Sequence, residues 1–111
     1  MRILTGLAMV TVIGAAAAAS AASAQPGRLT DVAYLEAARC AGLANSGKLG
    51  SSDGAALIAL LKAQANGREQ LVLDQADDAQ QRAKRQVNRA DDYMKSKLQA
   101  ELSTDCASFK G

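Results

Sequence analysis

The sequence predicts an all-α protein: a small bundle of three to four helices closed by one disulfide bond, with no β-sheet. Three observations predict this fold. Apolar residues recur every three or four positions through the C-terminal half, which is the period of a helix and not of a strand. Capping and turn residues divide the rest into segments of helical length. Cys40 and Cys106 are the only cysteines, so one intramolecular disulfide is available.

Composition excludes several classes of site. The chain has 111 residues, with 13 basic and 11 acidic residues, two Cys, and neither His nor Trp. Without His there is no catalytic triad, no Cys–His dyad and no imidazole metal or haem site, and two thiols are too few for a four-cysteine metal site. We therefore expect no metal and no cofactor. A net charge of +2 is too small to indicate a nucleic-acid partner.

Residues 1–24 have the layout of a cleavable secretory signal peptide. A basic residue, Arg2, precedes an apolar stretch, and an A-x-A sequence closes the segment, so cleavage is expected between Ala24 and Gln25. The alternative is a transmembrane anchor, since the segment is nearly long enough to span a bilayer. Its later residues are Ala, Ser and Gly, which favours cleavage and no stable transmembrane anchor afterwards.

Cleavage would leave residues 25–111 as a single helical domain in the periplasm or outside the cell. In an oxidising compartment Cys40 and Cys106 are expected to form a structural disulfide. A redox-active or metal-binding thiol pair is the alternative, but the two residues lack C-x-x-C spacing and any adjacent His. The bond would contribute roughly 4 kcal/mol in the loop-closure model. That is a large share of the stability of a small domain.

The first helix is expected from Val32 to Ala44, after Thr30 and Asp31, which are both N-cap residue types. Residues 45–47, with the sequence Asn-Ser-Gly, are expected to end it. Glu36 and Arg39 lie three apart on the polar face, where they can pair weakly. The opposite face consists of Tyr34, Ala37, Ala38 and Ala41. Because most of that face is alanine, a neighbouring helix can approach closely.

The second helix is expected from Ala55 to Asn66, between capping residues at 51–53 and Gly67. It begins with the apolar run AALIALL, in which Ala and Leu outnumber β-branched residues, so a helix is favoured over a buried strand. A helix that is apolar on all sides is expected to be the most buried of the set. The alternative is that its apolar surface docks on a membrane or a partner.

Residues 69–102 contain neither Gly nor Pro and carry an apolar stripe at helical spacing. The stripe comprises Val72, Ala76, Ala79, Ala83, Val87, Ala90, Met94, Leu98 and Leu102. One straight helix over this range would be about 50 Å long, and would hold Cys106 far from Cys40, whereas a disulfide needs Cα atoms within about 7 Å. Either the segment is broken, or the first helix packs high on it, or the cysteines pair between molecules. We favour a break at 88–92, where cap-competent Asn and Asp residues cluster.

Two carboxylate doublets are the candidate residues for hydrolysis of a cell-envelope sugar. They are Asp77-Asp78 and Asp91-Asp92. Adjacent residues of a helix point about 100° apart, so neither doublet converges on one bond. Each doublet also contains an acid four residues before a base, the favourable order for a helical ion pair. A solvated helix surface is therefore the favoured interpretation, with no catalytic residue.

The remaining chemical groups also have structural interpretations. A basic cluster occupies the middle of the long segment: Arg82, Lys84, Arg85 and Arg89. It resembles a contact for nucleic acid or acidic lipid, but no aromatic residue lies among its members, so a solvated face is favoured. The three aromatic residues are expected to fill the core: Tyr34, Tyr93 and Phe109.

No specific residues identify a family. In general outline, a small exported helical domain with two cysteines is similar to periplasmic acid-stress chaperones, a likeness of architecture and not of motif. Because the second helix is apolar on all sides and lies beside small-residue faces, the sequence predicts a non-enzymatic interaction, structural or protective protein whose alanine-lined helices reassort to expose apolar surface to a protein or another envelope component. The alternative is an envelope hydrolase that uses carboxylates.

Overall fold

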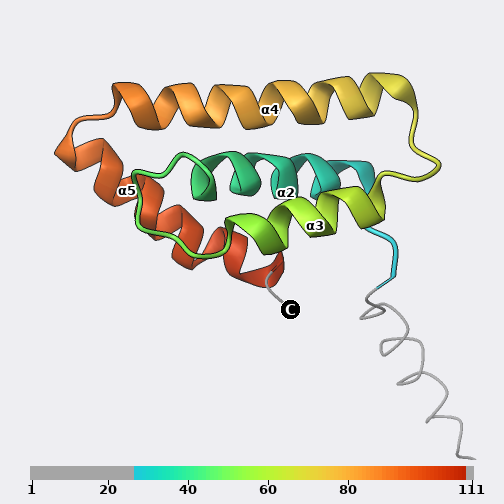
Figure 1. Ribbon diagram of the computed structural model, residues 1–111, viewed down its shortest axis with the longest axis horizontal. Helices are drawn as coiled ribbons and strands as arrows, with labels where there is room; N and C mark the ends of the chain where they lie inside the picture. The colour runs from blue at the N-terminus through green and yellow to red at the C-terminus, as the bar shows by residue number, and fades with distance from the viewer. Residues whose placement is uncertain (1–26, 110–111) are drawn as a thin grey trace, which may run out of the picture.

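The computed structural model describes residues 27–109, and over this range the chain is helical and has no strand (Figure 1). Its elements are α2 (Asp31–Ala44), α3 (Gly54–Gln64), α4 (Gln70–Arg89), α5 (Asp92–Ser103) and the 3-10 helix η2 (Asp105–Phe109). This confirms the predicted all-α fold. The predicted signal peptide and its cleavage site at Ala24 and Gln25 lie outside the described residues.

The central helix of the fold is α2. It lies between α4 on one side and α3 on the other, and α5 and η2 return to its C-terminal half (Figure 1). Every residue from Cys40 to Ala44 is buried. The prediction that the second helix is the most buried is wrong, because α3 packs one face only and buries Gly54, Leu57 and Leu61. The small residues of α2 allow two helices to approach it at once.

Both ends of α2 follow the local sequence signals. Thr30 is the N-cap, and its Oγ1 accepts a hydrogen bond from the Ala33 amide at 3.1 Å. Asn45 is the C-cap, and Gly47 follows with a φ of 78°, a left-handed conformation that favours glycine. In α3 the N-cap is Asp53, as expected, but the helix ends at Gln64, two residues earlier than predicted.

The helices α2 and α4 approach each other closely at Gly42. A Cβ atom on Gly42 would lie 2.4 Å from the carbonyl oxygen of Gln80 and 2.8 Å from the Cβ of Ala83. Ala83 and Val87 of α4 are fully buried at this contact. The glycine therefore sets the distance between the two helices.

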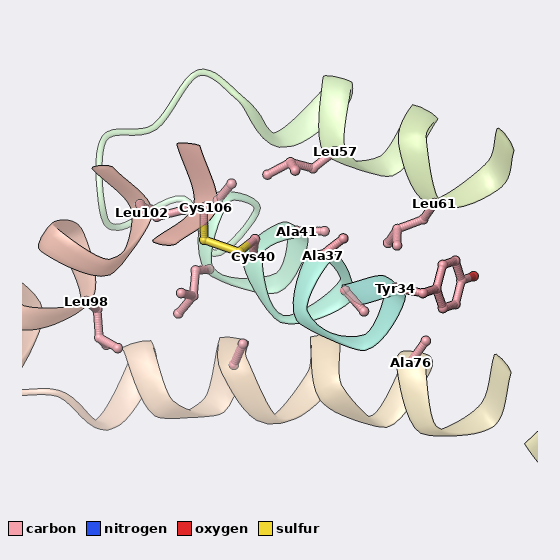
Figure 2. Packing of buried hydrophobic residues seen from close by; sticks show 14 of the residues in the cluster. Tyr34, Ala37, Cys40, Ala41, Leu57, Leu61, Ala76, Leu98, Leu102 and Cys106 are labelled. Carbon is pink, nitrogen blue, oxygen red and sulfur yellow. A yellow bond between two sulfur atoms is a disulfide. The ribbon is translucent and has the colours of Figure 1, made fainter. Parts of the chain in front are cut away.

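The long segment is broken where the sequence predicted a break. Ala90 and Asp91 have extended backbone, and the side chain of Asp91 caps α5 by accepting a hydrogen bond from the Met94 amide at 2.8 Å. The chain then turns back, and Cys106 of η2 forms a disulfide with Cys40, with 5.8 Å between the Cα atoms (Figure 2). The pairing in the structure is within the chain.

The predicted apolar stripe faces the core on both sides of the break. Six of its residues are buried: Val72, Ala76, Ala83, Val87, Leu98 and Leu102. The other three, Ala79, Ala90 and Met94, are partly buried against them. Of the aromatic residues, Tyr34 is buried and Phe109 half-buried, as predicted. The prediction for Tyr93 is wrong: it is 69% exposed, because it precedes the stripe residue Met94 by one position and points away from the core.

Candidate binding surfaces

One arginine connects the three helices α2, α4 and α5. Arg39 of α2 makes two hydrogen bonds to the carboxylate of Glu101 on α5, at 2.6 and 2.9 Å, and a third at 3.0 Å to Gln86 Oε1 on α4. The hydrogen bonds to Glu101 raise the pKa of Arg39 against the opposing effect of burial, so the guanidinium keeps its charge. Arg39 was expected to pair weakly with Glu36; the fold instead brings it to a partner 62 residues away.

The N-terminal end of α3 is joined to α2 through Asn45. The Asn45 Nδ2 donates to the carbonyl oxygens of Ala41, at 2.8 Å, and of Gly54, at 3.2 Å. One side-chain amide thus holds the last turn of α2 against the first residue of α3. The sequence identified Asn45 only as a residue that ends a helix.

The C-terminal end of α3 is joined to α2 through Arg68, which sequence reasoning missed. Its Nε donates to the Gln64 carbonyl at 2.7 Å, and its Nη atoms donate to Asp31 Oδ1 at 2.6 Å and to the Leu29 carbonyl at 2.7 Å. The guanidinium lies 4.3 Å from the ring centroid of Tyr34, and the side chain is 2% exposed. No local sequence pattern indicates that a single arginine in a loop is buried, so the contacts of Arg68 could not be predicted from the sequence.

Between these two ends, α3 contacts α2 mainly through two buried leucines, and Ile58 and Leu60 of α3 are partly buried against the core. Leu57 and Leu61 are buried, and they face Ala37 and Ala41 of α2 (Figure 2). The outer face of α3 is exposed to solvent and consists of Lys62 and four alanines: Ala55, Ala56, Ala59 and Ala63. An apolar helix is therefore attached to the fold along one face, through two buried and two partly buried apolar side chains, and by polar bonds at its two ends.

The carboxylate doublets are not brought together. Asp77 and Asp78 are exposed on α4, and Asp78 pairs with Arg82 as the spacing predicted. Asp78 lies about 17 Å of helix before the break that separates α4 from Asp91 and Asp92, whereas the two carboxylates of a glycosidase lie within about 10 Å of each other. Asp91 caps α5. This placement gives the hydrolase alternative no support.

The basic cluster lines an open hollow of about 870 Å³ at the corner between α4 and α5. Its lining residues are Arg39, Ala79, Arg82, Arg85, Gln86, Arg89, Ala90, Asp91, Tyr93 and Met94. Lys84, the fourth member of the predicted cluster, does not line it. The fold adds what the sequence lacked at this point, because Tyr93 of α5 supplies an aromatic ring and α2 supplies a further arginine.

A comparison of the chain with protein-family models, with curated proteins and with solved structures finds no match. Between residues 27 and 109, no group of three or more acidic or cysteine residues is arranged to hold a metal ion. In the same range no helix combines the length and the apolar character needed to cross a membrane.

Proposed function

We propose that the protein is an exported, non-enzymatic protective protein that binds apolar segments of partly unfolded polypeptides. The observation that carries this proposal is the attachment of α3, an apolar helix that packs mainly on α2 through Leu57 and Leu61. Its outward displacement would expose these leucines together with Ala37 and Ala41 of α2, which they now cover (Figure 2).

Release of α3 costs less free energy than global unfolding. Burial of two leucine side chains stabilises the contact by about 3–6 kcal/mol, and the loss of chain entropy on fixing α3 opposes it. Segments held by few buried apolar contacts open locally while the rest of a protein stays folded. The polar barriers to opening are then the hydrogen bonds of Asn45, the contacts of Arg68, and the side chain of Gln64, which accepts a hydrogen bond from the Leu29 amide and donates one to the Gly27 carbonyl.

The remainder of the fold does not depend on α3. The contact at Gly42 joins α2 to α4, the hydrogen bonds of Arg39 join α2 to both α4 and α5, and the disulfide joins α2 to η2. An opened molecule would therefore present a defined apolar surface on an intact scaffold. This is the behaviour that a protective protein needs, because the scaffold must survive while the surface is occupied.

The proposal is tested by comparing two variants at side chains whose hydrogen bonds contribute about 1 kcal/mol each. Asn45→Ala frees the start of α3, whereas the control Asp91→Ala removes the cap of α5 and leaves α3 in place. The readouts are binding of a hydrophobic dye from about pH 2 to about pH 8 and binding of reduced, carboxymethylated α-lactalbumin, a permanently unfolded probe, measured by fluorescence anisotropy. We expect Asn45→Ala to increase both about fivefold, since 1 kcal/mol changes an equilibrium by that factor.

The control is expected to leave both signals close to those of the unchanged protein. If the oxidised protein and Asn45→Ala bind neither dye nor the unfolded chain at any pH, the proposed function is wrong. If Asp91→Ala has the same effect as Asn45→Ala, the binding reflects general destabilisation, and the role of α3 is wrong.

Export is supported by the signal-peptide layout of residues 1–24 and by the disulfide. Protein purified from its host is expected to have the mass of residues 25–111. Cys40 and Cys106 are expected to resist alkylation until a reductant is added. Mass spectrometry before and after reduction measures both properties, and a retained leader with two freely alkylated thiols would contradict export.

A further inference from the structure

We propose that the hollow between α4 and α5 binds an organic anion, with a phosphate or carboxylate head held by Arg85 and Arg89 and an apolar or aromatic body against Tyr93 and Met94. This inference does not depend on the proposed function, because the hollow and α3 share no residue.

The first argument is the state of the four arginines that line the hollow. Arg39 is bound to Glu101 and Gln86, and Arg82 is bound to Asp78. Arg85 and Arg89 make no ion pair with any residue in the described part of the chain. Two guanidinium groups thus remain with their donors available, and guanidinium groups bind carboxylate and phosphate through paired hydrogen bonds.

The second argument is the spacing of these two residues. Arg85 and Arg89 are four positions apart on α4, so they lie on the same face about 6 Å apart along the axis. Like charges at this spacing destabilise a helix by a few tenths of a kcal/mol. An anion placed between them removes the repulsion. The helix macrodipole offers another explanation for the two arginines, because cations are favoured near the C-terminus of a helix. It does not explain the apolar surface beside them.

The third argument is the composition of the hollow. Its apolar side consists of Ala79, Ala90 and Met94, all partly buried, and Tyr93 stands 69% exposed beside them. The ammonium of Lys97 lies 5.2 Å from the Tyr93 ring centroid and adds another positive charge nearby. A volume of about 870 Å³ is large enough for a small organic molecule.

The charge balance favours an anion over a cation. Asp91 is the only acidic residue of the lining, and one of its carboxylate oxygens accepts the amide of Met94. Positive charges still outnumber negative ones when the carboxylates bound to Arg39 and Arg82 are included. A free organic phosphate and the phosphate of an acidic lipid share this chemistry, so the experiment must separate these two sources.

The test uses the oxidised chain of residues 25–111 at low salt, with phenyl phosphate, inorganic phosphate and vesicles of acidic phospholipid as separate probes. Amide chemical shifts of α4 and α5 report binding of the soluble probes, and co-sedimentation reports binding to vesicles. The variant Arg85→Gln/Arg89→Gln removes the two free cations. Its matched control, Lys84→Gln/Lys95→Gln, removes the same amount of charge from α4 and α5 at positions outside the hollow.

We expect phenyl phosphate to shift residues 85–94 and the arginine double variant to weaken this binding about tenfold or more. The lysine double variant should change it less than about twofold. Tyr93→Ala should weaken binding of phenyl phosphate and leave binding of inorganic phosphate unchanged. Binding to vesicles that requires the same two arginines supports a lipid head as the source, and binding to phenyl phosphate alone supports a free ligand.

Two results would overturn the inference. One is the absence of binding to all three probes. The other is an equal loss of binding in the arginine and lysine double variants, since only the net charge of the protein would then matter. Circular dichroism of both double variants checks that they keep their helices.

Discussion

Replacing Cys40 and Cys106 with alanine is expected to lower the free energy of unfolding by about 4 kcal/mol. The two residues are 66 positions apart, so the bond removes a large amount of conformational freedom from the unfolded chain. Both are buried, and alanine avoids placing a polar group in the core. Urea unfolding of residues 25–111, followed by far-ultraviolet circular dichroism, measures the change.

The loss of stability in the cysteine variant is expected to be unevenly distributed along the chain. Since α5 and η2 have few contacts with α2 apart from the disulfide and Arg39, their amide protons should lose protection from exchange first. The paired surface variant Ser103→Ala/Ser108→Ala, in the same two elements, should leave stability nearly unchanged because both residues are exposed. If the free energy of unfolding of the cysteine variant decreases by less than about 1 kcal/mol, a stabilising role for the bond is contradicted.

Gly42→Ala is expected to destabilise the protein by about 2 kcal/mol, and Gly42→Val by more. Helix propensity alone predicts the opposite sign, since alanine is better than glycine inside a helix by about 1 kcal/mol. The added Cβ would, however, lie 2.4 Å from the Gln80 carbonyl oxygen, a backbone atom that cannot rotate away. The helices α2 and α4 would have to separate and lose contact around Ala83 and Val87.

The matched control is Gly47→Ala. No atom lies within 4 Å of a Cβ at Gly47, but its φ is 78°, so the cost is one of backbone conformation alone, about 1 kcal/mol. Chemical denaturation of both variants measures their free energies of unfolding, which are then compared. An increase in stability for Gly42→Ala would show that α2 and α4 do not approach as closely as the structure has them.

Local sequence determined where the helices begin, end and break. Thr30 and Asp91 are capping residues at the positions where the sequence predicted helix starts, and the stripe from Val72 to Leu102 faces the core on both sides of the break. The disulfide also followed from the sequence, because only Cys40 and Cys106 were available, and a break between them was the favoured one of the three arrangements that chain geometry left open. These features depend on neighbouring residues or on chain length, which a sequence displays directly.

The tertiary structure decided which helix is central and which polar groups meet. The apolar run of α3 suggested a core helix, yet the small residues of α2 made α2 the helix that two others could approach. Arg39 is hydrogen-bonded to Glu101, and the guanidinium of Arg68 lies over the ring of Tyr34. Tyr93 lies beside the arginines of the hollow. Contacts of this kind join residues that are distant in sequence, and they depend on the distances and rotations between packed helices. A helical pattern specifies which face of a helix is apolar, but not the helix against which that face packs.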